Sequence, residues 1–190
     1  MTQQPLEKPY LLFVEGKDDK AVVELLLQHL GIESVEVYNV EGKNNFRKRI
    51  SAVSVQANFN EIVQRVGIVR DADEDPDAAR RSCADILRSI SRPTDFCIVP
   101  SEGPGMLEDL FLSAIENRPE RQCIEDFVQC VDSTAVKISS PSKFRMRTFL
   151  MLHDPDTMQS LNWVIQENLA NPTHPAFAPL RQFLTNFTSS

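Results

Sequence analysis

The chain has 190 residues, of which 42% are hydrophobic and 25% are charged, and its formal net charge is −7. This composition is typical of a globular domain with one sizeable core, and no apolar run approaches the roughly 20 residues that span a bilayer, which excludes a membrane-spanning protein. The first five residues lack the basic and apolar regions of a secretory signal, and the cysteines show no Cys-x-x-Cys spacing. We therefore expect a cytoplasmic protein with reduced thiols and no zinc site.

The negative charge by itself argues against a nucleic-acid surface, which requires positive potential. Its distribution weakens that objection, because many of the acids lie in two short segments, 15–19 and 71–77, where bound divalent cations would offset them. The basic residues form small clusters that, each taken alone, are explained better by solvated helix faces than by a nucleic-acid surface. These clusters are Arg47-Lys48-Arg49, Arg80-Arg81, and Lys143 with Arg145 and Arg147.

Four apolar segments rich in β-branched residues recur in the first half of the chain, with helical patterns between them. This alternation predicts an α/β fold with a central parallel sheet of about four strands flanked by helices. The strands are expected near 10–14, 35–40, 65–70 and 95–100, and the helices over about 18–30, 44–57 and 75–90. Gly31 is a typical C-terminal cap for the first helix, and Asp75-Pro76 is a typical start for the third.

The chain changes character after Gly103-Pro104-Gly105, because only helical patterns follow. Helices are expected around 107–115, 124–131, 142–152, 156–170 and 175–187. We expect residues 1–103 to form an α/β core and residues 104–190 a helical extension packed on it as one structural unit, since no linker is long enough to separate two domains. The aromatic side chains of the extension are interpreted as core anchors: Trp163, Phe177, Phe183 and Phe187.

Carboxylates follow the first and third predicted strands. Glu15 comes directly after the first apolar run, and Asp71 and Asp73 follow the third. Because the carboxyl ends of parallel strands meet at one edge of a sheet, where ligands bind in open α/β folds, we expect these three acids to lie close together. The Asp-x-Asp pair supplies the hard oxygen ligands that magnesium prefers. The sequence therefore predicts a site for Mg²⁺ or Mn²⁺.

Two further acids are candidate metal ligands, and each also has a purely structural explanation. Asp19 lies one helical turn after Glu15, but an acid in a first helical turn also stabilises the helix dipole by about 0.3–1 kcal/mol without any metal. Glu108 lies at the edge of an apolar helical stripe and is interpreted equally well as an exposed helix acid. The same dipole argument removes Asp75 and Asp77 from the site.

The tetrapeptide Val-Glu-Gly-Lys occurs twice, each time after a predicted strand. Chance, or a shared need for glycine in a turn, explains this repetition at least as well as a ligand does. In the functional interpretation, Gly16 and Gly42 let the backbone approach a phosphate group, and Lys17 and Lys43 reach that phosphate.

The segments Leu12–Asp19 and Ile68–Asp73 resemble the TOPRIM domain that type IA and II topoisomerases, bacterial primases, ribosomal RNA maturases and OLD-type nucleases share. An apolar strand ending in Glu-Gly and a later Asp-x-Asp are the marks of that domain. Asp19 and the segment Gly105–Glu108 resemble a small TOPRIM-like group near the OLD-type nucleases. The resemblance covers roughly residues 8–103.

The resemblance implies a compact parallel sheet between helices, with Asp71 and Asp73 as magnesium ligands. It also implies that Glu15 acts as a general acid or base, or binds a second metal. A lysine contributes in OLD-type sites, and Lys143 is a guess for that role, because no motif fixes it. Without the ATPase domain of OLD proteins, the breakage-tyrosine domain of topoisomerases or the zinc module of primases, we expect neither topoisomerase nor primase activity.

The predicted function is metal-dependent phosphodiester hydrolysis on nucleic acid, as in a nuclease. The alternative is a non-catalytic module that binds metal, nucleic acid or a nucleotide, as a homo-oligomer or within a larger defence or DNA-repair complex. A receiver-like phosphoacceptor domain fits poorly, because it expects an acidic pair directly after the first strand and one phosphoacceptor aspartate after the third. A haloacid-dehalogenase-type phosphatase carries Asp-x-Asp on its first strand, whereas this chain carries it on the third.

Overall fold

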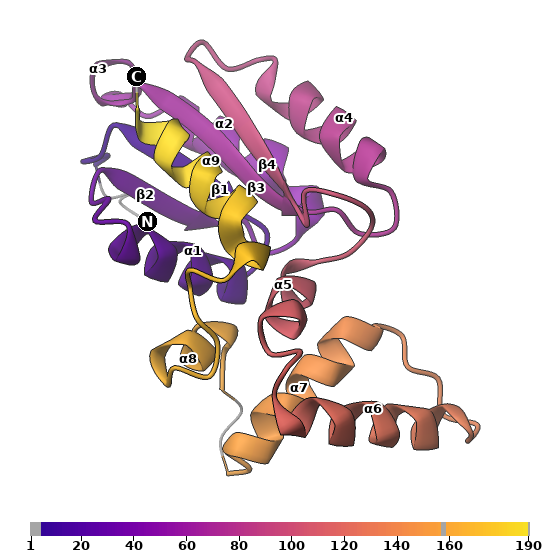
Figure 1. Cartoon of the computed structure of the whole chain (residues 1–190). Helices are drawn as coiled ribbons and strands as arrows, with labels where there is room; N and C mark the ends of the chain where they lie inside the picture. The colour runs from indigo at the N-terminus through magenta and orange to yellow at the C-terminus, as the bar shows by residue number, and fades with distance from the viewer. Residues whose placement is uncertain (1–4, 157–158, 190) are drawn as a thin grey trace.

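The computed structural model describes residues 5–156 and 159–189 (Figure 1). Four strands form one parallel sheet in the order β2-β1-β3-β4, which confirms the predicted α/β class and the four predicted strands. The strands are β1 (Tyr10–Val14), β2 (Val35–Asn39), β3 (Arg65–Asp71) and β4 (Thr94–Val99).

Helices connect the strands and make up the regular structure after β4 (Figure 1). The helices before β4 are α1 (Lys17–His29), the 3₁₀ turn η1 (Lys43–Asn45), α2 (Phe46–Ser54), α3 (Phe59–Ile62) and α4 (Pro76–Leu87). Those after β4 are α5 (Leu107–Ala114), α6 (Pro119–Asp132), α7 (Pro141–His153), α8 (Leu161–Gln166), the 3₁₀ turn η2 (Pro175–Phe177) and α9 (Ala178–Thr188). Within the described residues, no helix is long and apolar enough to cross a membrane.

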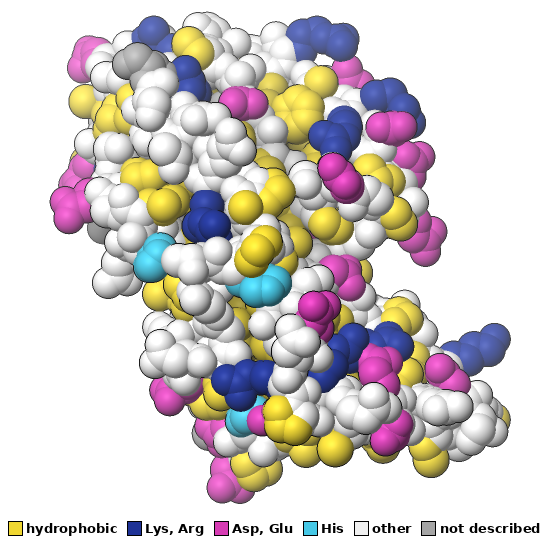
Figure 2. All heavy atoms as spheres, in the orientation of Figure 1, with side chains coloured by type: hydrophobic (Ala, Val, Ile, Leu, Met, Phe, Trp, Pro, Cys, Tyr) yellow, Lys and Arg dark blue, Asp and Glu magenta, His cyan; other side chains and the backbone are white. Residues whose placement is uncertain are grey.

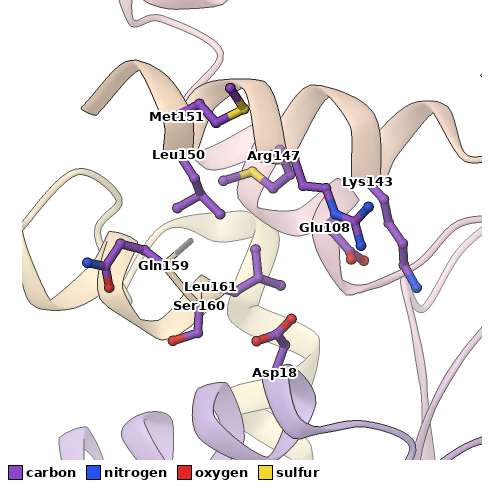
Figure 3. Close-up of a pocket in the computed structure, with 10 residues that line it drawn as sticks. Asp18, Glu108, Lys143, Arg147, Leu150, Met151, Gln159, Ser160 and Leu161 are labelled. Atoms are coloured by element: carbon purple, nitrogen blue, oxygen red, sulfur yellow. The ribbon is translucent and has the colours of Figure 1, made fainter. Parts of the chain in front are cut away.

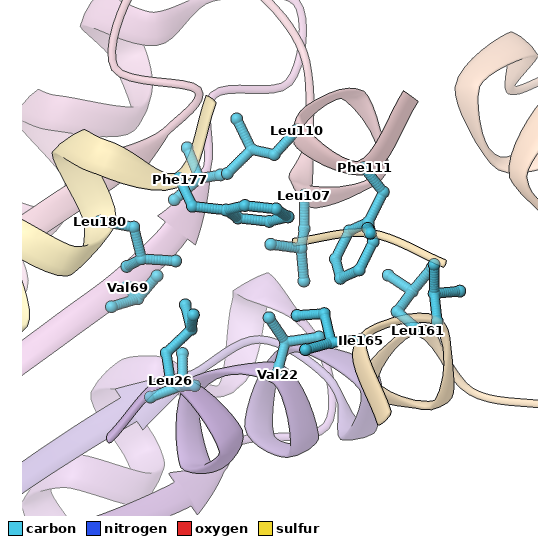
Figure 4. Close-up of a cluster of buried hydrophobic side chains, with 14 of the residues drawn as sticks. Val22, Leu26, Val69, Leu107, Leu110, Phe111, Leu161, Ile165, Phe177 and Leu180 are labelled. Carbon is cyan, nitrogen blue, oxygen red and sulfur yellow. The ribbon is translucent and has the colours of Figure 1, made fainter. Parts of the chain in front are cut away.

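The sheet is apolar on both faces, as expected for parallel strands covered by helices on both sides. Leu12 and Val14 of β1 point into an apolar cluster with α1, α5, α8 and α9, whereas Leu11 and Phe13 point into a second cluster with α2, α3 and α4. Figure 4 shows the first cluster, in which Leu26 of α1 and Leu107 of α5 converge. Residues from both sides of Gly103 therefore share one core.

The C-terminal helix α9 lies across one face of the sheet (Figure 1). Phe187 is fully buried, and a Cβ atom added at Gly67 of β3 would lie 2.7 Å from the Phe187 ring. The Tyr10 hydroxyl donates to the carbonyl of Thr188 at 3.3 Å, and Arg65 donates to the carbonyl of Phe187 at 3.1 Å. The end of the chain is thus fitted closely to the two central strands.

Helices α6 and α7 pack on each other and lie away from the sheet, connected to it through α5 and α8 (Figure 1). An ion pair joins them, because the Arg145 side chain donates to both carboxylate oxygens of Glu125, at 2.9 and 3.0 Å. Figure 2 shows that the surface is indented between this helical pair and the sheet portion. Helix α7 carries Lys143 at the edge of the sheet portion.

Two predicted helices are shorter than expected. The segment predicted as one helix over 44–57 is the turn η1 followed by α2, which ends at Ser54, and α3 follows separately. The Ser54 hydroxyl donates to the carbonyl of Ser51, a local bond that competes with helix continuation. The helix predicted over 156–170 is α8 alone, which ends at Gln166 shortly before Asn168 adopts a left-handed φ of 58°. Residues 157–158 of that prediction lie outside the described residues.

Candidate functional site

Strands β1 and β3 are neighbours at the topological switch point of the sheet, where the connections that follow the two strands run in opposite directions. From β1 the chain crosses to β2 on one side, and from β3 it crosses to β4 on the other. Ligands of open α/β sheets bind beyond the carboxyl ends of the strands at such a point. The register pairs Val14 with Val69, so Glu15 and Asp71, which follow these residues, reach the same edge. Topology therefore brings together Glu15 and Asp71, two of the three acids that the sequence predicted to meet.

Asp71 is the last residue of β3, and its side chain is only 8% exposed. Its Oδ1 accepts a hydrogen bond from the backbone amide of Leu107, the first residue of α5, at 2.9 Å. Burial and the nearby negative charges of Asp19, Glu108 and Glu15 raise the pKa of Asp71 to about 8, although the Leu107 amide lowers it. The carboxylates of Asp19, Glu108 and Glu15 therefore lie close enough to Asp71 to repel its negative charge.

Glu15 has one carboxylate oxygen, Oε2, that is buried and has no hydrogen-bond partner among the described residues. Burial and then the charges of Asp73 and Asp19 raise the pKa of this carboxyl. The positive charges of Arg70 and Lys43 act in the opposite direction. A buried oxygen without a partner costs about 1–3 kcal/mol, and a bound cation would satisfy it.

Asp19 lies in the first turn of α1, and its Oδ2 accepts a hydrogen bond from the amide of Gly16 at 3.0 Å. The predicted helix-start role is therefore confirmed, and the same side chain also lines the cavity at the sheet edge. Burial raises the pKa of Asp19 in spite of this bond, and the positive charge of Lys143 lowers it. Asp75 also has its predicted cap role, because its side chain accepts from the amide of Ala78 at 2.8 Å.

An open cavity of about 400 Å³ collects most of the predicted site residues at the carboxyl ends of β1, β2 and β3. Asn39 and Glu41, from the end of β2, were not among the predicted ligands. The nine lining residues are Glu15, Gly16, Lys17, Asp19, Asn39, Glu41, Gly42, Asp71 and Lys143. The cavity thus combines carboxylates with two lysines.

Asp73 does not line the cavity that Asp71 lines, although the sequence predicts the two residues as a joint ligand pair. Asp73 has a left-handed φ of 54°, and its backbone exchanges two hydrogen bonds with Gly105, at 2.8 and 2.7 Å. The Asp73 carboxylate pairs with the Lys43 ammonium group at 2.9 Å and does not line the cavity. The charge of Asp73 raises the pKa of Glu15, and the charges of Asp19, Glu108 and Glu15 raise the pKa of Asp71, so Glu15 interacts with both aspartates.

Metal binding at this edge stays a prediction. Across residues 5–156 and 159–189, no three Asp, Glu, His or Cys side chains are arranged so that they could hold a metal ion. The donor set itself suits a hard cation, because it consists of carboxylates and includes the unpartnered Oε2 of Glu15. Burial and then the charges of the neighbouring carboxylates raise the pKa of Asp71. Side-chain rearrangement around Glu15 and Asp71 would be needed to complete the coordination.

Lys143 lies between two cavities, in the first turn of α7. Besides the cavity at the sheet edge, it lines a second one of about 380 Å³ (Figure 3). Figure 3 shows Glu108, Lys143 and Arg147 on one side of this second cavity, with Asp18 opposite them. Burial raises the pKa of Glu108, and the charge of Lys143 lowers it. The guessed lysine is therefore close to the predicted acids.

The two Val-Glu-Gly-Lys segments are used differently. The amide of Gly16 donates to Asp19, and the amide of Gly42 donates to the carbonyl of Glu15 at 2.9 Å. Only Gly42 has a positive φ, of 111°, which favours glycine there. In this structure both amides bind the chain itself, not a ligand, and Lys43 binds Asp73. Lys17 and Lys143 remain the cations that line the acidic cavity.

Arg70 is a site residue that sequence reasoning did not select. It lies next to Asp71 in β3, donates to the hydroxyl of Ser82 at 2.8 Å, and lowers the pKa of Glu15. Its Nε is buried and has no hydrogen-bond partner among the described residues. The available signal was a charged residue within an otherwise apolar strand pattern, directly before the Asp-x-Asp pair.

Several solved structures are similar to this chain at low scores. The C-terminal region of the Burkholderia pseudomallei OLD protein aligns with a TM-score of 0.43 and 16% identity, covering 94% of this chain and 89% of that chain. The C-terminal region of the Xanthomonas campestris pv. campestris OLD protein, phased with iodine, aligns with a TM-score of 0.42 and 14% identity, covering 92% and 86%. At these values the similarity has no bearing on function.

No curated protein matches the chain significantly. The family model described as "Protein of unknown function (DUF3226)" matches residues 9–189, which is nearly the whole chain. The chain therefore belongs to the DUF3226 family.

Proposed function

We propose that this protein is a phosphodiester hydrolase of the nuclease type that depends on Mg²⁺ or Mn²⁺ and acts at the carboxyl ends of β1 and β3. The observation that carries the proposal is the arrangement of Glu15 and Asp71 at the switch point of the sheet, where burial and then the charges of neighbouring carboxylates raise the pKa of both carboxyls. Crowded buried carboxylates are unfavourable unless they serve a ligand or a reaction.

Each side chain has a role that follows from its position. Asp71, Asp73, Asp19 and Glu108 would hold the cation beside Glu15. When bound, the cation supplies polarisation of a phosphate oxygen. Glu15 would accept a proton from the attacking water, because a carboxyl with a raised pKa is a more effective base near neutral pH. Lys17 and Lys143 would neutralise the phosphate charge.

A second candidate function is a non-catalytic module that binds metal, nucleic acid or a nucleotide at the same site, alone or within a defence or DNA-repair complex. The ion pair between Lys43 and Asp73 favours it, because it occupies one of the two predicted magnesium ligands.

Cleavage separates the two candidates. Purified protein with Mn²⁺ or Mg²⁺ is expected to cut plasmid DNA or single-stranded nucleic acid, and Glu15→Gln and Asp71→Asn are each expected to lower the rate at least about 100-fold, the lower range for loss of a group that transfers protons. Product formation is followed on gels over time. Glu33→Gln, which removes one exposed carboxylate far from the site, should leave the rate unchanged.

The hydrolase proposal fails if no substrate is cut with any divalent cation, or if cutting survives in both site variants. Cation and nucleic-acid binding without cleavage would establish the non-catalytic module instead.

A further inference from the structure

A basic groove lies beside the acidic site, on the face of the sheet that α2 and α4 cover. It consists of two open hollows of about 450 and 510 Å³ that share Arg47 of α2 and Asp85 of α4. We call it the arginine groove and define it by its charged residues, which are Lys43, Arg47, Arg81, Asp85 and Arg88.

The arginine groove is positively charged, although the chain as a whole is negatively charged. Four cations and one acid line it, whereas the whole chain has a net charge of −7. Arg47 is exposed and makes no ion pair with any residue that the structure describes. Arg81 faces Asp75 only at 3.9 Å, Arg88 pairs with Asp85 at 2.8 Å, and all four side chains are mostly exposed. Such exposed pairs contribute little, so these arginines are available to an external anion.

The groove adjoins the acidic site at Lys43, because Lys43 lines the groove and the preceding residue, Gly42, lines the acidic cavity. The Nζ of Lys43 lies 2.9 Å from Oδ2 of Asp73. The amide of Gly42, the residue before Lys43, donates to the carbonyl of Glu15 at 2.9 Å. A chain of phosphates that follows the groove from Arg88 past Arg47 to Lys43 would therefore arrive at Glu15.

We propose that the arginine groove binds the phosphodiester backbone of a nucleic acid and leads the strand to the acidic site. Guanidinium groups bind phosphate in two-pronged geometry, and the serine and asparagine side chains between them are typical phosphate donors. The lining contains no aromatic side chain, which a protein partner would use as an anchor and a base would use for stacking. The groove thus contacts the backbone, independently of base sequence.

This inference rests on the proposed function for its purpose, but its test does not depend on cleavage. Binding of fluorescently labelled single-stranded and duplex DNA is measured by anisotropy in EDTA across a range of salt concentrations. For Arg47→Ala/Arg81→Ala, we expect at least tenfold weaker binding and a salt slope that is shallower by about 1.4–1.8, because each lost phosphate contact removes about 0.7–0.9 from the slope.

The matched control is Lys20→Ala/Lys137→Ala, which removes the same charge from a partly exposed position on α1, where Lys20 pairs with Glu24, and from an exposed position on the α6–α7 connection. It should bind DNA almost as the wild type does. Mn²⁺ should raise the unfolding temperature of the groove variant as much as that of the wild type, since the acidic site is unchanged.

The groove proposal is overturned if the arginine variant binds like the wild type, if the lysine control weakens binding equally, or if polyglutamate binds and DNA does not. If the groove variant loses DNA binding although the wild type never cleaves, the groove stands and the hydrolase function fails.

Discussion

In the absence of divalent cations, Asp71→Asn is expected to be more stable than the wild type at pH 8. The pKa of Asp71 is about 8 in the folded protein, against an ordinary value of 3.8, so the folded state binds this proton more tightly than the unfolded state does. The stability that the protonated carboxyl contributes is complete below pH 4 and is lost as the pH rises through 8. Asparagine cannot ionise, and its carbonyl oxygen can still accept from the amide of Leu107.

The measurement is urea unfolding in EDTA at several pH values between 5 and 8. The free energy of unfolding of the wild type should fall by up to about 1.4 kcal/mol per pH unit in this window, and Asp71→Asn should reduce that dependence. Glu15, Asp19 and Glu108 also have raised pKa values, so the stability of Asp71→Asn should still fall with rising pH, but less steeply than that of the wild type. Asp77→Asn, an exposed aspartate in α4, should keep the wild-type slope. Identical slopes in the wild type and Asp71→Asn would contradict the buried, repelled carboxylate.

Phe187→Ala is expected to destabilise the fold by about 3–5 kcal/mol, the usual range for removing a buried phenylalanine ring. The ring is fully buried, contacts Tyr10 and Phe183 with centroid distances of 5.9 and 5.6 Å, and fills the space above Gly67. Its loss would leave a cavity against the two central strands and loosen α9. Urea unfolding at one fixed pH measures the effect.

Phe183→Ala is the matched control, because it removes the same atoms from a partly exposed position of the same helix. It should lower the free energy of unfolding clearly less than Phe187→Ala does.

Gly67→Ala adds a second test: it should destabilise the wild type, where the new Cβ meets the ring at 2.7 Å, more than it destabilises Phe187→Ala. A loss below about 1 kcal/mol for Phe187→Ala, or additive effects in the double variant, would show that α9 is not fitted to the sheet as described.

The sequence predicted the strands well because their apolar patterns are local and strong. The meeting of Glu15 and Asp71 was also predictable, since it follows from two strand ends and the rule that ligands bind beyond the carboxyl ends of parallel strands. The helix starts at Asp19 and Asp75 followed from capping chemistry, which involves neighbours in the chain.

The rest of the site depends on contacts between distant segments, which no local pattern contains. The position of Asp73 outside the cavity accompanies its bridge to Gly105 and its ion pair with Lys43, each about 30 residues away in the chain. The Leu107 amide reaches Asp71 only because α5 begins over the end of β3. Lys143 reaches the cavity because α7 packs on α5, a contact between helices that the sequence does not specify.

Binding of Mn²⁺, followed by the electron paramagnetic resonance signal of the free ion, tests most directly whether the carboxylates at the ends of β1 and β3 form a metal site. The wild type should bind Mn²⁺ more tightly at pH 8 than at pH 6, because Asp71 must lose its proton to become a ligand. Glu15→Gln and Asp71→Asn should each weaken binding at least tenfold, whereas Asp77→Asn should bind as the wild type does. No binding at millimolar Mn²⁺, or equal binding by the wild type and both site variants, would contradict a metal site at this edge of the sheet.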